Sequence, residues 1–331
     1  MQEYLLKDSC ATCLKWGLPP PKRPLEEYVR KGIIALDKPA GPTSHKVVEW
    51  VKEVTGVENA GHAGTLDPGV SGVLPVGLGR ATKVLMALLN ADKEYVCVMK
   101  LHDDVDKERL LEVCKEFIGE IYQVPPVRSA VKRRVRKRRI YYIDILEIRG
   151  RYVLMRVGCE HGTYIRKLCS DIGDALGCGA SMKELRRTRV GPFKEEEGLV
   201  TLHELVHAFK RWREEGDEKL VRKVVQPMEK AVEELPKIVV KDTAIEAIAH
   251  GAQLAAPGVA LVTSDVKPGE LTAVLSLKGE IVAFCKPLIP AREILKKTEG
   301  VVAKIERVII ERGVYPRVWR RKQKEGDASK T

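Results

Sequence analysis

The chain has 331 residues, and its 58 lysines and arginines outnumber its 46 aspartates and glutamates, which gives a formal net charge of +12. This length exceeds what one hydrophobic core usually fills, so we expect two domains. The positive charge indicates an anionic polymer as partner, although charge alone does not separate nucleic acid from an acidic membrane. No apolar run reaches the ~18 residues of a membrane span, and the amino terminus lacks the order of a signal peptide. We therefore expect a cytoplasmic protein without a membrane span.

Eight cysteines are scattered along the chain, which favours reduced thiols over a disulfide framework. Cys10 and Cys13 have the spacing of a zinc knuckle or a redox pair. No second pair lies near them to complete four ligands. We therefore expect no metal, and any other role of the pair stays open.

The first 30 residues contain four prolines and alternating charges, which is typical of an extended arm. From Gly32 to about Gly191, β-branched strand candidates alternate with helical patterns, so we expect an α+β fold with much antiparallel sheet. The strand candidates include 33–36, 95–101, 140–148 and 152–159, and the helical patterns include 107–117 and 166–176. Two more helices are expected over 202–212 and 219–231, where Pro227 must start or kink the second.

After about Pro236 the composition changes to short strand candidates and turns, with one helix expected over 243–250. Such spacing suits a small β-barrel. The tail from Arg320 to Thr331 is charged and built of small residues, which predicts a segment without fixed structure.

The stretch 61–74 isolates one carboxylate, Asp67, among glycines and small residues. That is how a lone nucleophile is presented to a bulky substrate. Pro68 pushes Asp67 out of the helical region, and the glycines Gly64, Gly69 and Gly72 permit close approaches that a Cβ would forbid. An isolated Asp-Pro pair is usually only a turn, so the context decides.

Four further blocks accompany this stretch in a fixed order, at 38–44, 93–95, 162–168 and 184–191. Together the five blocks resemble the motifs of the pseudouridine synthases. The resemblance is to the branch that contains the bacterial tRNA pseudouridine-55 synthase and the archaeal and eukaryotic dyskerin proteins. The stretch 125–132 and the C-terminal region resemble the dyskerin part of this branch, and the lack of a long lysine-rich extension favours an archaeal origin.

The resemblance implies an α+β architecture in four parts. An N-terminal arm over 1–30 would pack on the C-terminal domain. A mixed, largely antiparallel pseudouridine synthase domain would cover 31–235, and a PUA domain, a small RNA-binding β-barrel, would cover 236–313. A charged tail over 314–331 would follow.

The resemblance also implies three catalytic residues, Asp67, Tyr95 and Arg166. Isomerising uridine breaks the N1–C1′ bond and joins C5 to C1′, so it needs a carboxylate near C1′ but no metal, redox partner or other cofactor. A guanidinium can hold that carboxylate through two parallel hydrogen bonds, the role expected for Arg166. Tyr95 offers a ring face to uracil and a phenol for proton removal at C5. Whether Asp67 acts as nucleophile or stabilises a positive sugar stays open.

Four residues would bind the substrate uridine, which must leave its stack to react. By resemblance His62 lies beside the flipped nucleotide, Tyr164 lies against the base, and Leu185 forms an apolar wall. Lys38 is expected either to contact a phosphate or to support a turn.

A basic run at 132–139 places seven cations in eight positions between two strand candidates. Such runs repel themselves unless an anion binds, and contacts to phosphates make affinity depend on salt. The run resembles the thumb with which the family presses RNA into its cleft. The residues expected to bind RNA are Arg128, Lys132, Arg133, Arg134, Arg136, Lys137, Arg138 and Arg139.

The resemblance to dyskerin implies the catalytic subunit of an H/ACA guide-RNA particle that acts on rRNA. Its partners would be the guide RNA and three small proteins: a zinc-bearing subunit, a β-barrel subunit and a kink-turn-binding protein. Guide-independent modification of uridine 55 in tRNA is an alternative that can coexist. A non-catalytic RNA scaffold is an alternative of another class, against which Asp67, Tyr95 and Arg166 argue. The target uridines and the need for partners stay open.

Overall fold

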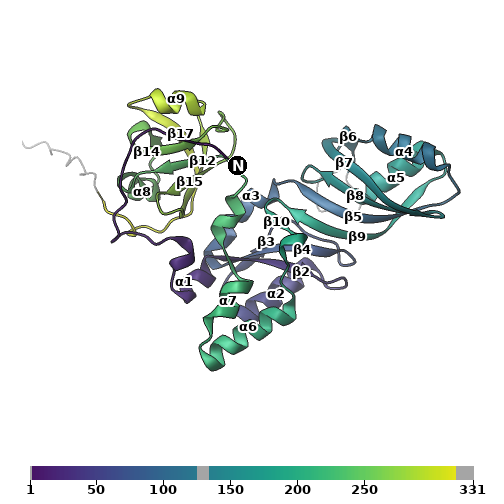
Figure 1. Cartoon of the computed structure of the whole chain (residues 1–331), viewed down its shortest axis with the longest axis horizontal. Helices are drawn as coiled ribbons and strands as arrows, with labels where there is room; N and C mark the ends of the chain where they lie inside the picture. Colours follow the sequence, from purple (N-terminus) through teal and green to yellow (C-terminus); the bar gives the residue numbers. More distant parts are fainter. Residues whose placement is uncertain (1, 125–133, 318–331) are drawn as a thin grey trace, which may run out of the picture. The chain divides into compact units, whose positions relative to one another are not determined.

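The computed structural model describes residues 2–124 and 134–317 (Figure 1). Contacts divide the chain into one unit of Pro24–Glu234 and a second unit of Met1–Arg23 with Leu235–Thr331. The N-terminal arm was expected to run to residue 30, but α1 (Leu25–Arg30) belongs to the first unit. The reason is its apolar face, since Leu25, Tyr28 and Val29 are buried in the core of that unit.

The first unit is built on a ten-stranded sheet with the order β11-β2-β4-β9-β5-β8-β7-β6, to which β10 and β3 add beside β9 and β4. Its strands are β2 (Gly32–Lys38), β3 (Ala60–His62), β4 (Ser71–Leu78), β5 (Lys93–Leu101), β6 (Gly119–Gln123), β7 (Arg136–Arg149), β8 (Tyr152–Cys159), β9 (Ala180–Val190), β10 (Phe193–Lys194) and β11 (Gln226–Pro227). β4 and β9 pair in parallel, whereas β2 with β4 and β5 with β9 pair antiparallel. The expected mixed, largely antiparallel α+β fold is therefore confirmed.

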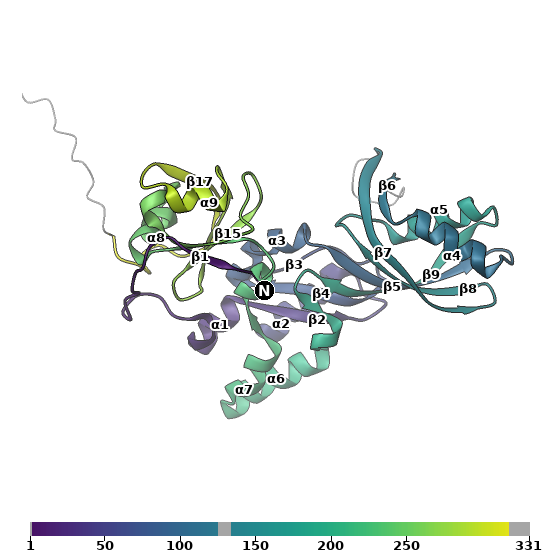
Figure 2. The ribbon, with the colours of Figure 1, turned by 45° about the horizontal axis from the view of Figure 1, so that its top comes forward.

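Two apolar clusters hold helices against this sheet. One cluster joins β2 and β4 to the helices α1, α2 (Ser44–Thr55), α6 (Leu202–Glu215) and α7 (Glu218–Val224). The other joins β5, β7, β8 and β9 to α4 (Lys107–Glu116) and α5 (Ile165–Leu176). Figure 2 shows α4 and α5 beside the strands β6 to β9, and α3 (Leu85–Leu89) follows β4. The helices expected over 107–117, 166–176 and 202–212 are confirmed.

The helix expected over 219–231 is confirmed only in its first part, as α7, and a separate 3₁₀ helix begins after Pro227. α7 ends at Val224, and the next residue, Val225, is extended, with φ −106° and ψ 130°. A proline disfavours the helical region for the residue before it and has no N–H of its own. Gln226 and Pro227 therefore pair with β2 as β11. The short 3₁₀ helices are η1 (Pro20–Lys22), η2 (Gly79–Lys83), η3 (Glu195–Glu197), η4 (Met228–Val232) and η5 (Ala256–Gly258).

The second unit contains a seven-stranded sheet with the order β1-β14-β12-β15-β16-β17-β13. Its elements are β1 (Tyr4–Leu6), β12 (Lys237–Val240), α8 (Asp242–Ala249), β13 (Leu254–Ala255), β14 (Val259–Thr263), β15 (Thr272–Ser276), β16 (Ile281–Pro287), α9 (Ala291–Lys296) and β17 (Val301–Val308). The N-terminal arm joins this unit, because β1 pairs antiparallel with β14. Asp242 accepts hydrogen bonds from the Thr12 hydroxyl and the Cys13 amide, both at 2.9 Å.

No helix in the described part of the chain is long and apolar enough to cross a membrane. The tail expected to lack fixed structure lies, from residue 318 on, outside the described residues.

Candidate active site

The segment that carries Asp67 follows β3 and includes the first residues of β4, and we call residues 64–73 the Asp67 segment. Hydrogen bonds from outside hold it in place. Ser44, which is fully buried at the start of α2, donates to the Leu66 carbonyl at 3.0 Å and accepts from the Leu66 amide at 2.9 Å. The Gly41 amide donates to the Pro68 carbonyl at 2.7 Å. The Asp67 side chain is nevertheless 62% exposed. A fixed backbone thus presents an exposed carboxylate to solvent.

Lys38 is among the donors that hold this segment. It is 0% exposed, and its Nζ donates to the carbonyls of Pro39, Pro68 and Val70 at 2.9, 3.2 and 2.8 Å. An ammonium has three hydrogens, so none remains for a phosphate. Of the two roles expected for Lys38, the geometry supports the turn residue and argues against the phosphate contact. Burial lowers the pKa of Lys38, and the nearby Arg187 adds to this effect.

Asp67 contacts Arg166, the second residue of α5. Arg166 Nη2 lies 2.9 Å from Asp67 Oδ2, across 99 residues of sequence. One hydrogen bond joins them here rather than the expected parallel pair. Both side chains are more than half exposed, at 57% and 62%, and an exposed ion pair contributes only about 0–1 kcal/mol to stability. The contact can therefore orient the carboxylate without holding the fold together.

Tyr95 lies on β5 between Val157 of β8 and Arg187 of β9. Burial raises the pKa of Tyr95, and the neighbouring Arg187 guanidinium opposes this rise. The Asp67 carboxylate is close enough to raise the same pKa further. The Tyr95 phenol therefore lies within electrostatic reach of both groups and is protonated at neutral pH.

Tyr164 caps the start of α5, and its backbone is held by a residue that sequence reasoning missed. Gln123, the last residue of β6, is 2% exposed. Its Oε1 accepts from the Tyr164 amide at 2.9 Å, and its Nε2 donates to the Tyr164 carbonyl at 3.2 Å. The two residues are 41 positions apart, so no local pattern links them.

His62 ends β3, and its ring centroid lies 5.1 Å from that of His45, an exposed residue of α2 that was not expected at the site. Burial lowers the pKa of His62, and His45 and Arg187 lower it further. His62 is therefore neutral near pH 7. Its Nδ1 is buried and has no hydrogen-bond partner among the described residues. Leu185 on β9 is partly buried and packs against both apolar clusters of the sheet.

The basic run is not a single loop, because β7 begins at Arg136. Along a strand, side chains alternate between two faces. Lys137 and Arg139 are exposed, whereas Arg136 and Arg138 are half-buried. Lys137 Nζ lies 2.7 Å from Glu120 Oε1. Arg134 is exposed, and we call residues 134–139 the basic strand end.

Arg138 lies beside the turn that precedes Tyr164. A Cβ added at Gly162 would lie 3.0 Å from its guanidinium, and Gly162 has a φ of +73°. The remaining residues of the expected RNA contact, Arg128, Lys132 and Arg133, lie outside the described residues.

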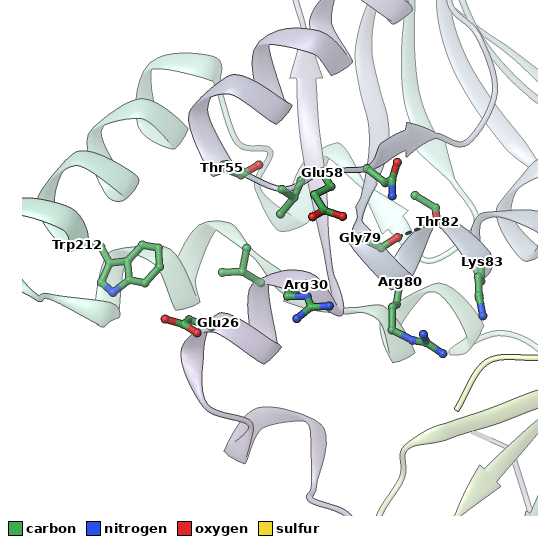
Figure 3. A pocket seen from close by; sticks show the side chains of 13 residues that line it. Glu26, Arg30, Thr55, Glu58, Gly79, Arg80, Thr82, Lys83 and Trp212 are labelled. Atoms are coloured by element: carbon green, nitrogen blue, oxygen red, sulfur yellow. Dashed lines mark hydrogen bonds between the residues drawn. The ribbon is translucent and has the colours of Figure 1, made fainter. Parts of the chain in front are cut away.

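A cavity of about 620 Å³ lies elsewhere in the first unit. Figure 3 shows Glu26 and Trp212 at one end of it and Arg80 and Lys83 at the other. None of the expected site residues lines it. In the described ranges no group of three or more His, Cys, Asp or Glu side chains could hold a metal ion. Cys10 and Cys13 are free and exposed.

Four family models match the chain. They are the DKCLD domain over 1–48, the N-terminal domain of the TruB family of pseudouridylate synthases over 52–165, the C-terminal domain of tRNA pseudouridylate synthase B over 166–233 and the PUA domain over 236–309. Together they cover most of the chain in the order expected from its motifs.

Relatives and solved structures match over nearly the whole length. A probable tRNA pseudouridine synthase B of Methanopyrus kandleri is 57% identical over 96% of this chain and 94% of its own. The corresponding protein of Pyrococcus furiosus is 55% identical over 98% and 95%. A structure of a Cbf5–Nop10–Gar1 complex aligns with a TM-score of 0.92 at 55% identity, covering 96% of this chain and 97% of the other.

A structure of an H/ACA RNP bound to a substrate RNA containing 2′-deoxyuridine aligns with a TM-score of 0.90 at 52% identity, covering 96% of this chain and 98% of the other. These likenesses extend through both units. The chain therefore belongs to the TruB family of pseudouridine synthases, isomerases that convert uridine in RNA to pseudouridine, and carries a DKCLD domain and a PUA domain.

Proposed function

We propose that this pseudouridine synthase is the catalytic subunit of an H/ACA guide-RNA particle that modifies rRNA. The observation that carries the proposal is the alignment over 96% of the chain with proteins whose structures were solved in a Cbf5–Nop10–Gar1 complex and in an H/ACA RNP with substrate RNA. The partners proposed are a guide RNA and three small proteins: a zinc-bearing subunit, a β-barrel subunit and a kink-turn-binding protein. We propose the cytoplasm as its location.

Asp67 is the proposed catalytic carboxylate, and Arg166 orients it. In the reaction the N1–C1′ bond breaks, the base turns, C5 bonds to C1′, the C5 proton leaves, and N1 takes up a proton. Asp67 acts at C1′, either as nucleophile or by stabilising positive charge on the sugar. Support comes from the exposure of its side chain, from the buried hydrogen bonds beneath it and from the 2.9 Å contact with Arg166.

Tyr95 is the proposed contact to uracil and takes part in removing the C5 proton. Because its phenol is protonated at neutral pH, it must lose that proton before it can accept another. His62 and Tyr164 are proposed beside the flipped nucleotide, and Leu185 as an apolar wall. The neutral ring of His62 suits a place beside an uncharged base.

RNA binding is proposed for the basic strand end and for the PUA domain, over 236–313. Arg134 and Arg139 expose their cations to solvent, where a phosphate can reach them. The arm over residues 1–23 is proposed as a support of the PUA domain, as its pairing with β14 suggests.

Guide-independent modification of uridine 55 in tRNA is the second candidate. The names of the curated relatives favour it, because they refer to tRNA pseudouridine synthase B. A scaffold without catalysis is disfavoured by the Asp67–Arg166 contact, which RNA binding alone does not require.

One experiment separates these candidates. The purified chain would be incubated with tRNA and with a guide-matched rRNA fragment, in the presence and absence of guide RNA and the three partner proteins. Pseudouridine would then be mapped at each uridine. The proposal expects conversion of the rRNA fragment only with guide and partners. Conversion of tRNA alone would favour the second candidate, and no conversion under any condition would favour the scaffold.

A further inference from the structure

Arg187 on β9 is a buried charge that the roles above do not use. Its side chain is 1% exposed and is among the largest fully buried side chains of the described residues. Among the described residues no carboxylate lies within ion-pair distance of its guanidinium, whereas the adjacent Arg186 pairs with Asp37 and Glu195 at 3.0 and 2.5 Å. Burying a charge without an opposite charge is costly. A buried guanidinium of this kind therefore points to a role in holding or charging the groups around it.

The guanidinium of Arg187 joins the two ends of the Asp67 segment. Its Nη2 donates to the carbonyl of Gly64 at 3.0 Å, and its Nε donates to the carbonyl of Val73 at 2.8 Å. The segment also packs on the Arg187 backbone: Gly72 has a φ of +102°, and a Cβ there would lie 2.2 Å from the Arg187 carbonyl oxygen. Arg187 therefore sets the position of the loop that presents Asp67.

The same guanidinium lies next to Tyr95. Arg187 and Tyr95 are directly opposite each other in the pairing of β5 with β9. Burial raises the pKa of Tyr95, and the charge of Arg187 opposes that rise because it favours the phenolate. Burial lowers the pKa of His62 and lowers the pKa of Lys93 to about 8, and the charge of Arg187 adds to both effects. One buried cation thus acts on several groups around the site.

We propose that Arg187 is a positioning residue of the isomerisation, which holds the Asp67 segment against β9 and places a positive charge beside Tyr95. Tyr95 can accept the C5 proton only when it is ionised to the phenolate, and the charge of Arg187 favours that ionised form. Because Arg187 is buried, neither solvent nor RNA reaches its charge. The charge therefore favours the phenolate of Tyr95 both before and after RNA binds. The inference deepens the proposed function, because it rests on the role proposed for Tyr95.

The test compares Arg187→Gln, which removes the charge, with Arg187→Lys, which keeps the charge but loses the planar fork. Arg186→Gln is the matched control on the same strand, since Arg186 has carboxylate partners of its own. The full chain would be labelled with difluorotyrosine, and the resonance of Tyr95 assigned by its loss in Tyr95→Phe. Fluorine NMR then follows its titration without any need for activity.

We expect the Tyr95 titration to move to higher pH in Arg187→Gln and to stay near that of the unaltered chain in Arg187→Lys and Arg186→Gln. The single-turnover rate, measured on an RNA that the unaltered chain converts, should fall at least about tenfold in Arg187→Gln and less in Arg187→Lys. RNA affinity should not change, because the side chain is buried.

An unmoved Tyr95 titration in a folded Arg187→Gln would overturn the electrostatic role, whatever the rate. Should Arg187→Gln fail to fold, Arg187→Lys decides: an unaltered rate would overturn the positioning role. Failure of the proposed function gives a different result, namely full activity of Asp67→Asn or Tyr95→Phe together with the expected shift in titration.

Discussion

The Asp67 segment and the basic strand end both belong to the proposed site, but they are held in opposite ways. Buried groups hold the Asp67 segment, namely Ser44, Lys38 and Arg187, each donating to backbone carbonyls. The basic strand end carries exposed cations, and the ion pair of Lys137 with Glu120 is also exposed. Chemistry at C1′ requires atoms in fixed positions, whereas binding of an RNA backbone requires cationic side chains that are exposed to solvent. The buried groups that hold the Asp67 segment should therefore control the rate of isomerisation, and the exposed cations of the basic strand end should control RNA affinity.

The largest effect should follow from Asp67→Asn, which keeps the shape of the side chain and removes its charge and nucleophilicity. We expect turnover to be abolished and RNA affinity to stay almost unchanged, as measured by single-turnover conversion and by filter binding. Asp103→Asn is the control, because Asp103 is an exposed carboxylate paired with Arg151 at 3.1 Å. Residual activity above a few per cent in Asp67→Asn would contradict the assignment.

Arg166→Lys should have the next largest effect. It keeps the charge opposite Asp67 but loses the planar group that orients the carboxylate. We expect the single-turnover rate to fall by at least about tenfold, or ~1.4 kcal/mol of transition-state stabilisation. Thermal stability should change little, since the pair is exposed. A rate equal to that of the unaltered chain would show that Arg166 does not orient Asp67.

Gln123→Glu sharpens the comparison, because it changes one buried hydrogen bond and no exposed charge. An ionised Glu still accepts from the Tyr164 amide but repels the Tyr164 carbonyl, at a cost of about 1–3 kcal/mol. Burial raises the pKa of such a carboxyl, and its protonated form can donate to that carbonyl. We therefore expect a rate loss of a few-fold that shrinks as the pH is lowered, relative to the unaltered chain at the same pH. A loss that is the same at every pH would contradict this account.

The smallest effect on the rate should come from the basic strand end. Arg134→Ala with Arg139→Ala removes two exposed cations, so RNA affinity should fall and its dependence on log salt should flatten by about 0.7–0.9 for each phosphate that the protein no longer neutralises. The rate at saturating RNA should not change. Arg149→Ala is the control, because Arg149 is an exposed cation at the other end of β7, outside the proposed RNA contact. An altered rate with normal affinity would reverse the division between the two regions.

Sequence alone identified the features that depend on local order. Short windows of the sequence were enough to show the context of Asp67 and the order of the five motifs. They also showed the periodicities of several strands and of the helices α4, α5 and α6. The α+β class of the fold followed from them. The helix expected over 219–231 is divided for a local reason as well, since Val225 is extended and Pro227 precedes a separate 3₁₀ helix.

Only the tertiary structure decided which polar residues are buried and what they hold. In a sequence a lysine, an arginine or a glutamine is expected at the surface. Lys38 becomes buried because three carbonyls converge on its ammonium, and Arg187 because two strands bring Gly64 and Val73 to it from more than a hundred residues away. Gln123 meets Tyr164 in the same manner. Burial of a charge or an amide is stable only when its partners surround it, and these partners come from chain segments that only the folded sheet brings together.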